Sequence, residues 1–227
     1  MSQWTFSKGK NKMKDLVIIG TGGVGRDILN IIERSYEKTF SNIFFLDDNI
    51  NIGKKINNVE VVGKTTDLVN FSNQKTEIVI AIGNPLQRNF FYKFVNKNKY
   101  NLFSIIDRSV LIKKPVKIGK GVIIFPNTII SQDTKIGDNT LVDSNVLVGH
   151  DVIIKKNCVL SPMACILGKV VIESCVEVGC SSQIFLNVKV GKYSKIGMGS
   201  SVYKDVPRSF TVAGNPARAI RDNTKNK

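Results

Sequence analysis

The chain contains one histidine, His150, in the stretch LVGHDVII. A neutral imidazole titrates near neutral pH and can take a proton from an attacking group, so His150 is a candidate general base. Asp151 follows it directly, and a carboxylate can orient an imidazole and stabilise the imidazolium that forms. Neighbouring side chains on a flat strand point to opposite sides, so the two can cooperate only where the chain bends. The alternative interpretation of His150 is a solvated surface residue.

The cysteines predict neither a metal site nor a covalent intermediate. All four lie between Cys158 and Cys180, and no two form a CxxC pair. With a single histidine available, a zinc site is poorly supported, and we expect no metal. Cys158 falls at an inward, small position of the repeat described below, which disfavours an acyl-cysteine intermediate. Buried thiols of this kind are typical of a reducing cytoplasm, the predicted location.

The second half of the chain repeats every six residues. Steps of six from Ile112 meet sixteen aliphatic residues, the last being Val202. Steps of six from Val116 meet fifteen small or β-branched residues, the last being Ser200. Neither a helix nor an ordinary sheet has this period, whereas a short strand followed by a corner does. The pattern predicts a hexapeptide β-helix in which three hexads make one triangular coil.

The coil length makes a prediction about His150. One coil of 18 residues after His150 comes Gly168, which should therefore stack directly over the histidine. The Gly168 N–H, with no side chain in the way, could donate a hydrogen bond to a developing oxyanion. The period therefore predicts a base, an adjacent acid and a backbone donor at one corner.

The first half reads as half of a nucleotide-binding fold. A strand-like run precedes Gly20, Gly22 and Gly25, which match G-x-G-x-x-G and can place a phosphate at a helix N-terminus. The run NIFFLDD then puts an acidic pair about 20 residues past this turn, where a ribose hydroxyl is often bound. EIVIAIGNP should form a third strand and NLFSIID a fourth. One such half can hold one nucleotide, which favours a nucleotide-linked substrate over NAD.

These patterns divide the chain into four segments. Residues 1–13 are expected to be a flexible tail, 14–107 a Rossmann-like nucleotide-binding domain, 108–205 the β-helix, and 206–227 a C-terminal extension. The net charge is +15, but the lysines are scattered and no basic helix with interleaved aromatics occurs. We therefore expect attraction to anionic small molecules rather than to nucleic acid. No run of about 18 uncharged apolar residues is present, so no membrane partner is expected.

Several motifs together resemble one family. IIGTGGVG, FFLDD, AIGN, VGHDVII and the closing VAGNPARAI are similar to bacterial sugar O/N-acetyltransferases of the NeuD/PglD-like type. This group comprises sialic acid O-acetyltransferases and UDP-4-amino-sugar N-acetyltransferases. The resemblance extends from about Lys14 to Ile220. It implies an α/β Rossmann-like half domain followed by an all-β left-handed parallel β-helix that assembles as a homotrimer.

The resemblance also implies roles for individual residues. His150 and Asp151 correspond to the family's catalytic base and its acid, and Gly168 to a backbone amide near the thioester carbonyl. Acetyl-CoA is expected along the β-helix between subunits, where Gly168, Cys180 and Met198 occupy coenzyme-lining positions. The positions expected to bind the nucleotide sugar are Gly22, Gly23, Val24, Asp47, Asp48 and Gly83. Relatives often carry a histidine where this chain has Val24, and a second one near the thioester where it has Val159.

The predicted function is acetyl-CoA-dependent N-acetylation of a nucleotide-linked amino sugar, a UDP-, dTDP- or GDP-4-amino-deoxy sugar used in bacterial surface glycans. The first alternative is O-acetylation of a sialic-acid-like sugar. Two further alternatives come from other classes: a non-enzymatic, nucleotide-binding trimeric module, and an NAD-binding regulatory module.

Overall fold

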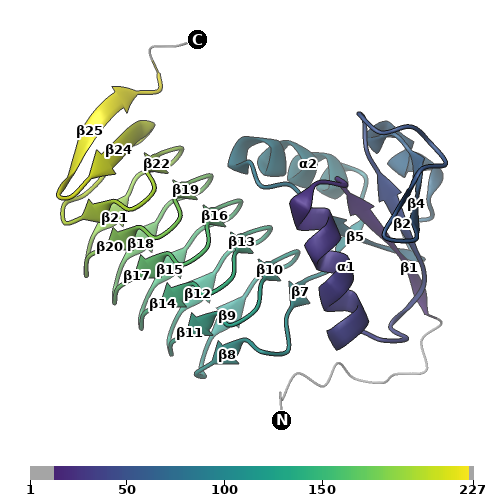
Figure 1. Ribbon diagram of the computed structural model, residues 1–227, viewed down its shortest axis with the longest axis horizontal. Helices are drawn as coiled ribbons and strands as arrows, with labels where there is room; N and C mark the ends of the chain where they lie inside the picture. Colours follow the sequence, from purple (N-terminus) through teal and green to yellow (C-terminus); the bar gives the residue numbers. More distant parts are fainter. Residues whose placement is uncertain (1–12, 225–227) are drawn as a thin grey trace.

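The computed structural model describes residues 13–224, and it consists of an α/β domain resting on one end of a β-helix (Figure 1). The predicted tail, residues 1–13, lies outside the described residues except for Met13. The α/β domain contains β1 (Lys14–Ile19), α1 (Gly23–Ser35), β2 (Phe40–Leu46), β3 (Lys55–Ile56), β4 (Val59–Gly63), a 3₁₀ helix (Thr65–Asn70), β5 (Thr76–Ile80), α2 (Pro85–Lys97) and β6 (Asn101–Leu102). Its sheet has the order β3-β4-β2-β1-β5-β6.

The centre of this sheet is parallel and buried on both faces. β1 pairs in parallel with β2 on one side and β5 on the other, and its residues Leu16–Ile19 are fully buried. Such continuous apolar runs are typical of central parallel strands. One element was not anticipated: β3 and β4 form an antiparallel hairpin at the sheet edge.

The run NLFSIID does not form a single fourth strand. β6 pairs with β5 of the α/β sheet, whereas β7 (Ile105–Ile106) pairs with β10 (Ile123–Ile124) of the β-helix. The chain changes partner at Ser104, whose hydroxyl donates to the Gly119 carbonyl and accepts from the Val122 N–H. From Ile105 onward, backbone hydrogen bonds run to the first coil, and the β-helix thus begins before residue 108.

The β-helix has three faces, each a parallel sheet. Face 1 contains β7, β10 (Ile123–Ile124), β13 (Leu141–Val142), β16 (Val159–Leu160), β19 (Glu177–Val178), β22 (Lys195–Ile196), and the closing hairpin β24 (Phe210–Gly214) and β25 (Ala217–Asp222). Face 2 contains β8 (Leu111–Ile112), β11 (Ile129–Ile130), β14 (Leu147–Val148), β17 (Cys165–Ile166), β20 (Gln183–Ile184) and β23 (Ser201–Val202). Face 3 contains β9 (Lys117–Ile118), β12 (Lys135–Ile136), β15 (Ile153–Ile154), β18 (Val171–Ile172) and β21 (Lys189–Val190).

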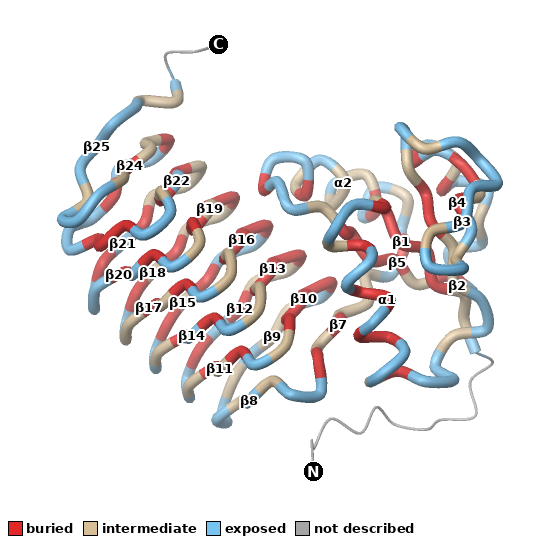
Figure 2. Tube along the Cα trace, viewed as in Figure 1, coloured by how far each residue is buried: buried red, intermediate tan, exposed pale blue. Residues whose placement is uncertain are grey.

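Successive coils are in register at 18 residues, so that Leu147 pairs with Cys165 and Cys165 with Gln183. From Ile124 to Val202, the aliphatic ladder predicted from the sequence forms one continuous buried cluster, against which Ile112 and Ile118 are partly buried. Figure 2 shows the buried residues recurring in successive coils. The small positions beside it are also buried, and their hydroxyls bond to carbonyls at the corners; Thr134, for example, donates to the Gly149 carbonyl at 2.9 Å. The interior therefore leaves no buried side-chain polar atom unsatisfied among the described residues.

From Gly121 to Gly199, every sixth residue lies at a corner with a positive φ, and most of these residues are asparagine, aspartate or glycine. Three columns of corners run along the β-helix, one between each pair of faces. The histidine corner joins faces 2 and 3 and stacks Gln132, His150, Gly168 and Leu186 in successive coils. The cysteine corner joins faces 1 and 2 and contains Cys180 and Met198, and the asparagine corner joins faces 3 and 1 and contains Asn139 and Asn157.

The α/β domain covers the first coils of face 1. Ile123, Leu141 and Val159 pack in the same buried cluster as Ile28 of α1. The Tyr36 hydroxyl accepts a hydrogen bond from the Ile106 N–H at 2.8 Å, and Arg34 forms an ion pair with Asp107. Face 1 is uncovered from β19 onward, where its outward residues become charged.

Candidate active site

The histidine corner brings His150 and Asp151 together. Asp151 has a φ of 59°, so the chain turns between the two residues and their side chains fall on the same side. The distance between His150 Nδ1 and an Asp151 carboxylate oxygen is 2.8 Å. If Nδ1–H donates to this carboxylate, Nε2 keeps its lone pair and can accept a proton. Both side chains are about half exposed in the single chain.

The His150 ring lies directly against Gly168, in the arrangement expected from the coil length. A Cβ at residue 168 would lie 2.6 Å from His150 Nε2 and 2.7 Å from Cε1. Gly149 is restricted in a similar way, because its Cβ would lie 2.8 Å from the Gly168 nitrogen. The coil-to-coil bond here runs from the Lys169 N–H to the His150 carbonyl, and the Gly168 N–H donates to no group within residues 13–224. A backbone donor therefore lies beside the imidazole.

A cavity of about 610 Å³ occupies the carboxyl ends of β1, β2 and β5. All six residues that were expected to bind the nucleotide sugar line it: Gly22, Gly23, Val24, Asp47, Asp48 and Gly83. Side chains at Gly22 and Gly23 would meet nothing within 4 Å. These glycines thus leave the N-terminus of α1 open, and no side chain caps it. An open helix N-terminus at the ends of parallel strands is suited to a phosphate.

Gly20 and Gly25, the other two glycines of the turn, are required by close backbone packing. Gly20 has a φ of +100°, and a Cβ on it would lie 3.0 Å from the Ala81 carbonyl oxygen. A Cβ on Gly25 would collide with the Gly20 carbonyl and approach the Phe45 ring. Gly25 consequently lets α1 pack closely against β1 and β2.

The acidic pair is held by two threonines that the sequence did not single out. One Asp47 oxygen accepts from the Thr21 N–H at 2.9 Å and from its hydroxyl at 2.7 Å, and the other accepts from the Asn49 N–H. Burial alone would raise the pKa of Asp47, but the hydrogen bonds from Asn49 and Thr21 together lower it. Asp48 accepts in the same way from Thr65. Asp47 thus fixes the glycine turn as well as lining the cavity.

α2 supplies further residues to this cavity. Its N-cap is Asn84, whose side chain accepts from the Leu86 and Gln87 N–H groups. The sequence Asn-Pro is a recognisable helix start that could have indicated this boundary. Gln87 and Phe90 line the cavity, and Phe90 is 65% exposed. No sequence signal identified this aromatic, because its orientation depends on how α2 packs.

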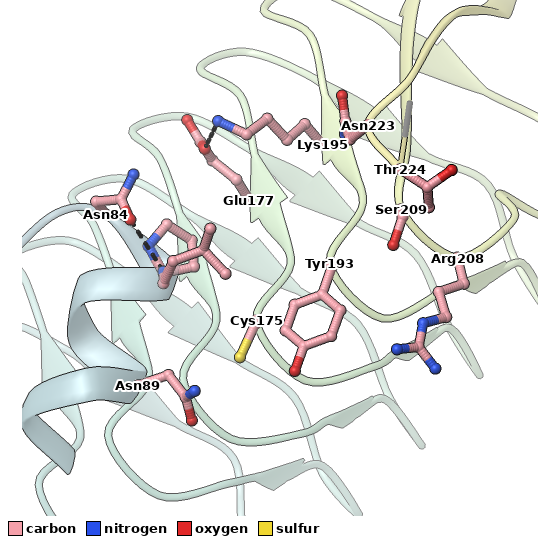
Figure 3. A pocket seen from close by; sticks show the side chains of 12 residues that line it. Asn84, Asn89, Cys175, Glu177, Tyr193, Lys195, Arg208, Ser209, Asn223 and Thr224 are labelled. Carbon is pink, nitrogen blue, oxygen red and sulfur yellow. Dashed lines mark hydrogen bonds and ion pairs between the residues drawn. The ribbon is translucent and has the colours of Figure 1, made fainter. Parts of the chain in front are cut away.

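A second cavity, of about 650 Å³, was not anticipated (Figure 3). It lies between the start of α2, the uncovered part of face 1 and the C-terminal segment. Glu177 and Lys195 form an ion pair of 2.9 Å on its face 1 side. Figure 3 shows Asn89 of α2 across from Cys175 and Tyr193 of the asparagine corner. The first turns of α2 therefore separate two cavities.

The expected coenzyme positions are divided between two corners. Cys180 and Met198 stack one coil apart at the cysteine corner, linked by the bond from the Gly199 N–H to the Cys180 carbonyl. Gly168 lies at the histidine corner, so face 2 separates these two sets within one chain. Val159, where relatives have a second histidine, is buried on face 1 beneath the α/β domain.

Residues 13–224 contain neither a metal-binding cluster nor a membrane-spanning helix. No group of three or more histidine, cysteine, aspartate or glutamate side chains is placed to hold a metal ion. No helix in that range combines the length and apolar character needed to cross a membrane. The four cysteines are unpaired.

Two family models match this chain. Residues 15–95 match the PglD N-terminal domain, and residues 133–168 match the bacterial transferase hexapeptide (six repeats). The second segment contains His150, Asp151 and Gly168. Each model thus falls on the part of the chain from which the corresponding fold was predicted.

Solved structures share the whole architecture. The acetyltransferase domain of PglB from Neisseria gonorrhoeae is 25% identical, with a TM-score of 0.87 over 91% of this chain and 100% of that one. PerB from Caulobacter crescentus, solved with CoA and GDP-perosamine, is 25% identical, with a TM-score of 0.83 over 92% of this chain and 99% of that one. The predicted fold, an α/β half domain followed by a β-helix, is confirmed.

Curated relatives match over a shorter segment. The 2,3,4,5-tetrahydropyridine-2,6-dicarboxylate N-acetyltransferase of Clostridium perfringens is 42% identical over 60 residues, which is 25% of this chain and 25% of that protein. The chain thus matches about a quarter of that relative's length. The resemblance predicted from the motifs is therefore confirmed: in its two matched segments and its shared architecture, the chain is similar to PglD/NeuD-like hexapeptide-repeat sugar acetyltransferases.

Proposed function

We propose that this protein is an acetyl-CoA-dependent N-acetyltransferase that acts on the amine of a nucleotide-linked amino sugar. The observation that carries the proposal is the presence, on one chain, of a nucleotide-type cavity and of a corner that joins His150, Asp151 and Gly168. PerB, which has the same architecture, was solved with CoA and GDP-perosamine, a nucleotide amino sugar. We place the reaction in the cytoplasm and in the synthesis of bacterial surface glycans.

In the proposed reaction, the neutral amine attacks the thioester carbonyl and a C–N bond forms. His150 Nε2 takes the proton that the amine loses, while Asp151 stabilises the imidazolium. The Gly168 N–H donates to the developing oxyanion. The C–S bond then breaks, and the coenzyme A thiolate takes the proton from the imidazolium.

Direct transfer is favoured over an acyl-cysteine intermediate. Complete burial raises the pKa of the Cys158 thiol to about 12, and burial also raises the pKa of the Cys165 and Cys175 thiols. The nucleophilic form of cysteine is the thiolate, which these environments disfavour at neutral pH. Cys180 lies at the cysteine corner, across face 2 from His150.

Release of free coenzyme A, followed with a thiol reagent across a panel of amino-sugar nucleotides, tests the proposal. We expect release with at least one UDP-, dTDP- or GDP-linked amino sugar and none with the matching hydroxy sugar. An alkali-stable product would identify an amide, whereas an alkali-labile product would identify an ester and support O-acetylation instead. Nucleotide binding without any release would favour the non-enzymatic module.

We further propose that two neighbouring copies, within a homotrimer, complete each active site. In one chain, face 2 separates the histidine corner from the cysteine corner, and a coenzyme lying between two copies could contact the histidine corner of one and the cysteine corner of the other. Face 2 and its edges also expose several large apolar side chains: Leu111, Leu147, Met163, Phe185, Leu186, Met198 and Tyr203. An apolar surface of this kind is typical of an interaction site.

Leu147→Glu is expected to dissociate the trimer and to lower acetyl transfer in parallel. Leu147 projects from face 2, where a copy of the chain would bury an unpaired carboxylate, which is strongly unfavourable. Sedimentation velocity would report the change in mass. Lys135→Gln, on exposed face 3, changes the charge by the same amount and should keep the wild-type mass. A Leu147→Glu protein that sediments as a trimer would contradict the assignment of this face.

Asp47→Asn is expected to weaken nucleotide binding by about tenfold. An amide has one acceptor oxygen, so it cannot accept from both the Thr21 and Asn49 N–H groups, and the glycine turn loses an anchor worth roughly 1–3 kcal/mol. Calorimetric titration with UDP and GDP would measure the affinity. Asp15→Asn is the control, because Asp15 bonds the exposed Asn42 at the opposite end of β1. Unchanged nucleotide affinity in Asp47→Asn would contradict this role.

A further inference from the structure

Arg88 is a fully buried cation on α2, and it forms no ion pair with a carboxylate of residues 13–224. Its guanidinium donates instead to four oxygen atoms that are not charged. Nη1 donates to the Ile80 and Ile82 carbonyls at 2.7 and 2.9 Å. Nε donates to the Asn139 carbonyl and Nη2 to the Asn139 side-chain oxygen, both at 2.9 Å. Burial lowers the pKa of Arg88 to about 9, which leaves it charged at neutral pH.

The bonds from Arg88 to Ile80 and Ile82 fix a strand end that forms part of the nucleotide cavity. Ile80 and Ile82 flank Ala81 at the end of β5, and the Ala81 N–H donates to the Ile19 carbonyl of β1. The Ala81 carbonyl lies against Gly20, the first glycine of the turn. Ile82 and Gly83 line the cavity itself. Arg88 therefore fixes the strand end on which the glycine turn rests.

The bonds from Arg88 to Asn139 link α2 to the asparagine corner of the β-helix. Asn139 returns a hydrogen bond from Nδ2 to the Arg88 carbonyl at 3.0 Å, and it also donates to the Asn157 side-chain oxygen at 2.8 Å. Asn157, one coil further on, donates to the Asn89 side chain of α2 at 3.0 Å. Two residues of α2 are thus joined to two consecutive coils by a buried polar network. Such a network is rigid only while every member is satisfied.

We infer that Arg88 is a positioning residue, which locks the nucleotide cavity to the β-helix and thereby sets where a nucleotide-linked acceptor meets the acetyl donor. The inference rests on the proposed function. Gln87 and Phe90, on either side of Arg88 in sequence, line the nucleotide cavity, while Asn89 lines the second cavity. A shift of α2 would therefore move the walls of both cavities relative to the coils. Displacing a reacting group by about 1 Å can cost about 100-fold in rate.

Comparison of Asn139→Gly with Arg88→Met separates the two halves of the network. Asn139→Gly removes the side-chain links to Arg88 and Asn157, keeps the bonds to Ile80 and Ile82, and suits the positive φ of 52° at this corner. Arg88→Met removes all four guanidinium bonds, and Arg88→Lys restores the charge and part of the bonding. Asn127→Gly is the matched control, because Asn127 has a φ of 60° at another corner and its side chain takes no part in the network.

We expect Asn139→Gly to lower kcat for the nucleotide sugar about tenfold, with the Kd for UDP or GDP within twofold of wild type. Arg88→Met should lower kcat about 100-fold without changing the KM for acetyl-CoA, and Arg88→Lys should recover part of this loss. Unchanged kcat in Asn139→Gly, or parallel losses of kcat and nucleotide affinity in that variant, would overturn the inference. A wild-type chain that transfers acetyl groups to no nucleotide-linked amine would instead overturn the proposed function, and the inference with it.

Discussion

His150→Gln is expected to lower kcat for acetyl transfer by about 100- to 10,000-fold, the range typical of a lost general base. Glutamine is similar in reach and can still bond to Asp151, but its amide has no basic nitrogen to accept the proton of the amine. Because the His150 side chain is 57% exposed in the single chain, its replacement should leave the melting temperature nearly unchanged. Single-turnover measurement of coenzyme A release, at saturating acceptor, would isolate the chemical step.

Asp151→Asn provides the internal comparison for this prediction. It keeps the size of the side chain that contacts His150 Nδ1 but removes the negative charge that would stabilise the imidazolium. We expect a loss of rate smaller than that of His150→Gln. A His150→Gln protein that retains more than a tenth of wild-type kcat, with its oligomeric state intact, would show that another group takes the proton.

The β-helix could be predicted from the sequence because each of its coils repeats the same local requirement. Each strand has two residues and is followed by a corner, so Val148 pairs with Ile166, its counterpart one period away, and the other strands pair in the same way. The same rule placed Gly168 against His150. In a quasi-one-dimensional fold, sequence distance translates directly into spatial distance.

Contacts between the two halves follow no such rule and were not predicted. The link from Arg88 to Asn139 spans 51 residues, and neither the charge nor the spacing of Arg88 distinguishes it from exposed basic residues. The second cavity likewise depends on where α2 rests above face 1. The acidic pair shows an intermediate case: its position at the cavity was predicted, but its bonds to Thr21 and Thr65 depend on side-chain orientations that spacing does not specify.

Gly168→Ala is expected to lower kcat by about 100-fold although it adds a single methyl group. Its backbone does not have a positive φ, and Gln132 and Leu186 occupy the same column of the histidine corner, so the coil itself accepts a side chain at this position. The new Cβ would lie 2.6 Å from His150 Nε2, and the ring must therefore tilt away. The melting temperature should change little, and the loss should appear in the chemical step.

A double-mutant comparison identifies the route by which this methyl group acts. If the methyl group impairs transfer by displacing the imidazole, then Gly168→Ala should cause almost no further loss in a protein that already contains His150→Gln, because the base is gone. The Gly168 N–H remains in both proteins, so its contribution to the oxyanion cancels unless the backbone moves. Full additivity of the two losses would mean that the methyl group acts on the backbone donor or on coenzyme binding. A wild-type rate in Gly168→Ala alone would contradict the close approach of ring and glycine on which this corner depends.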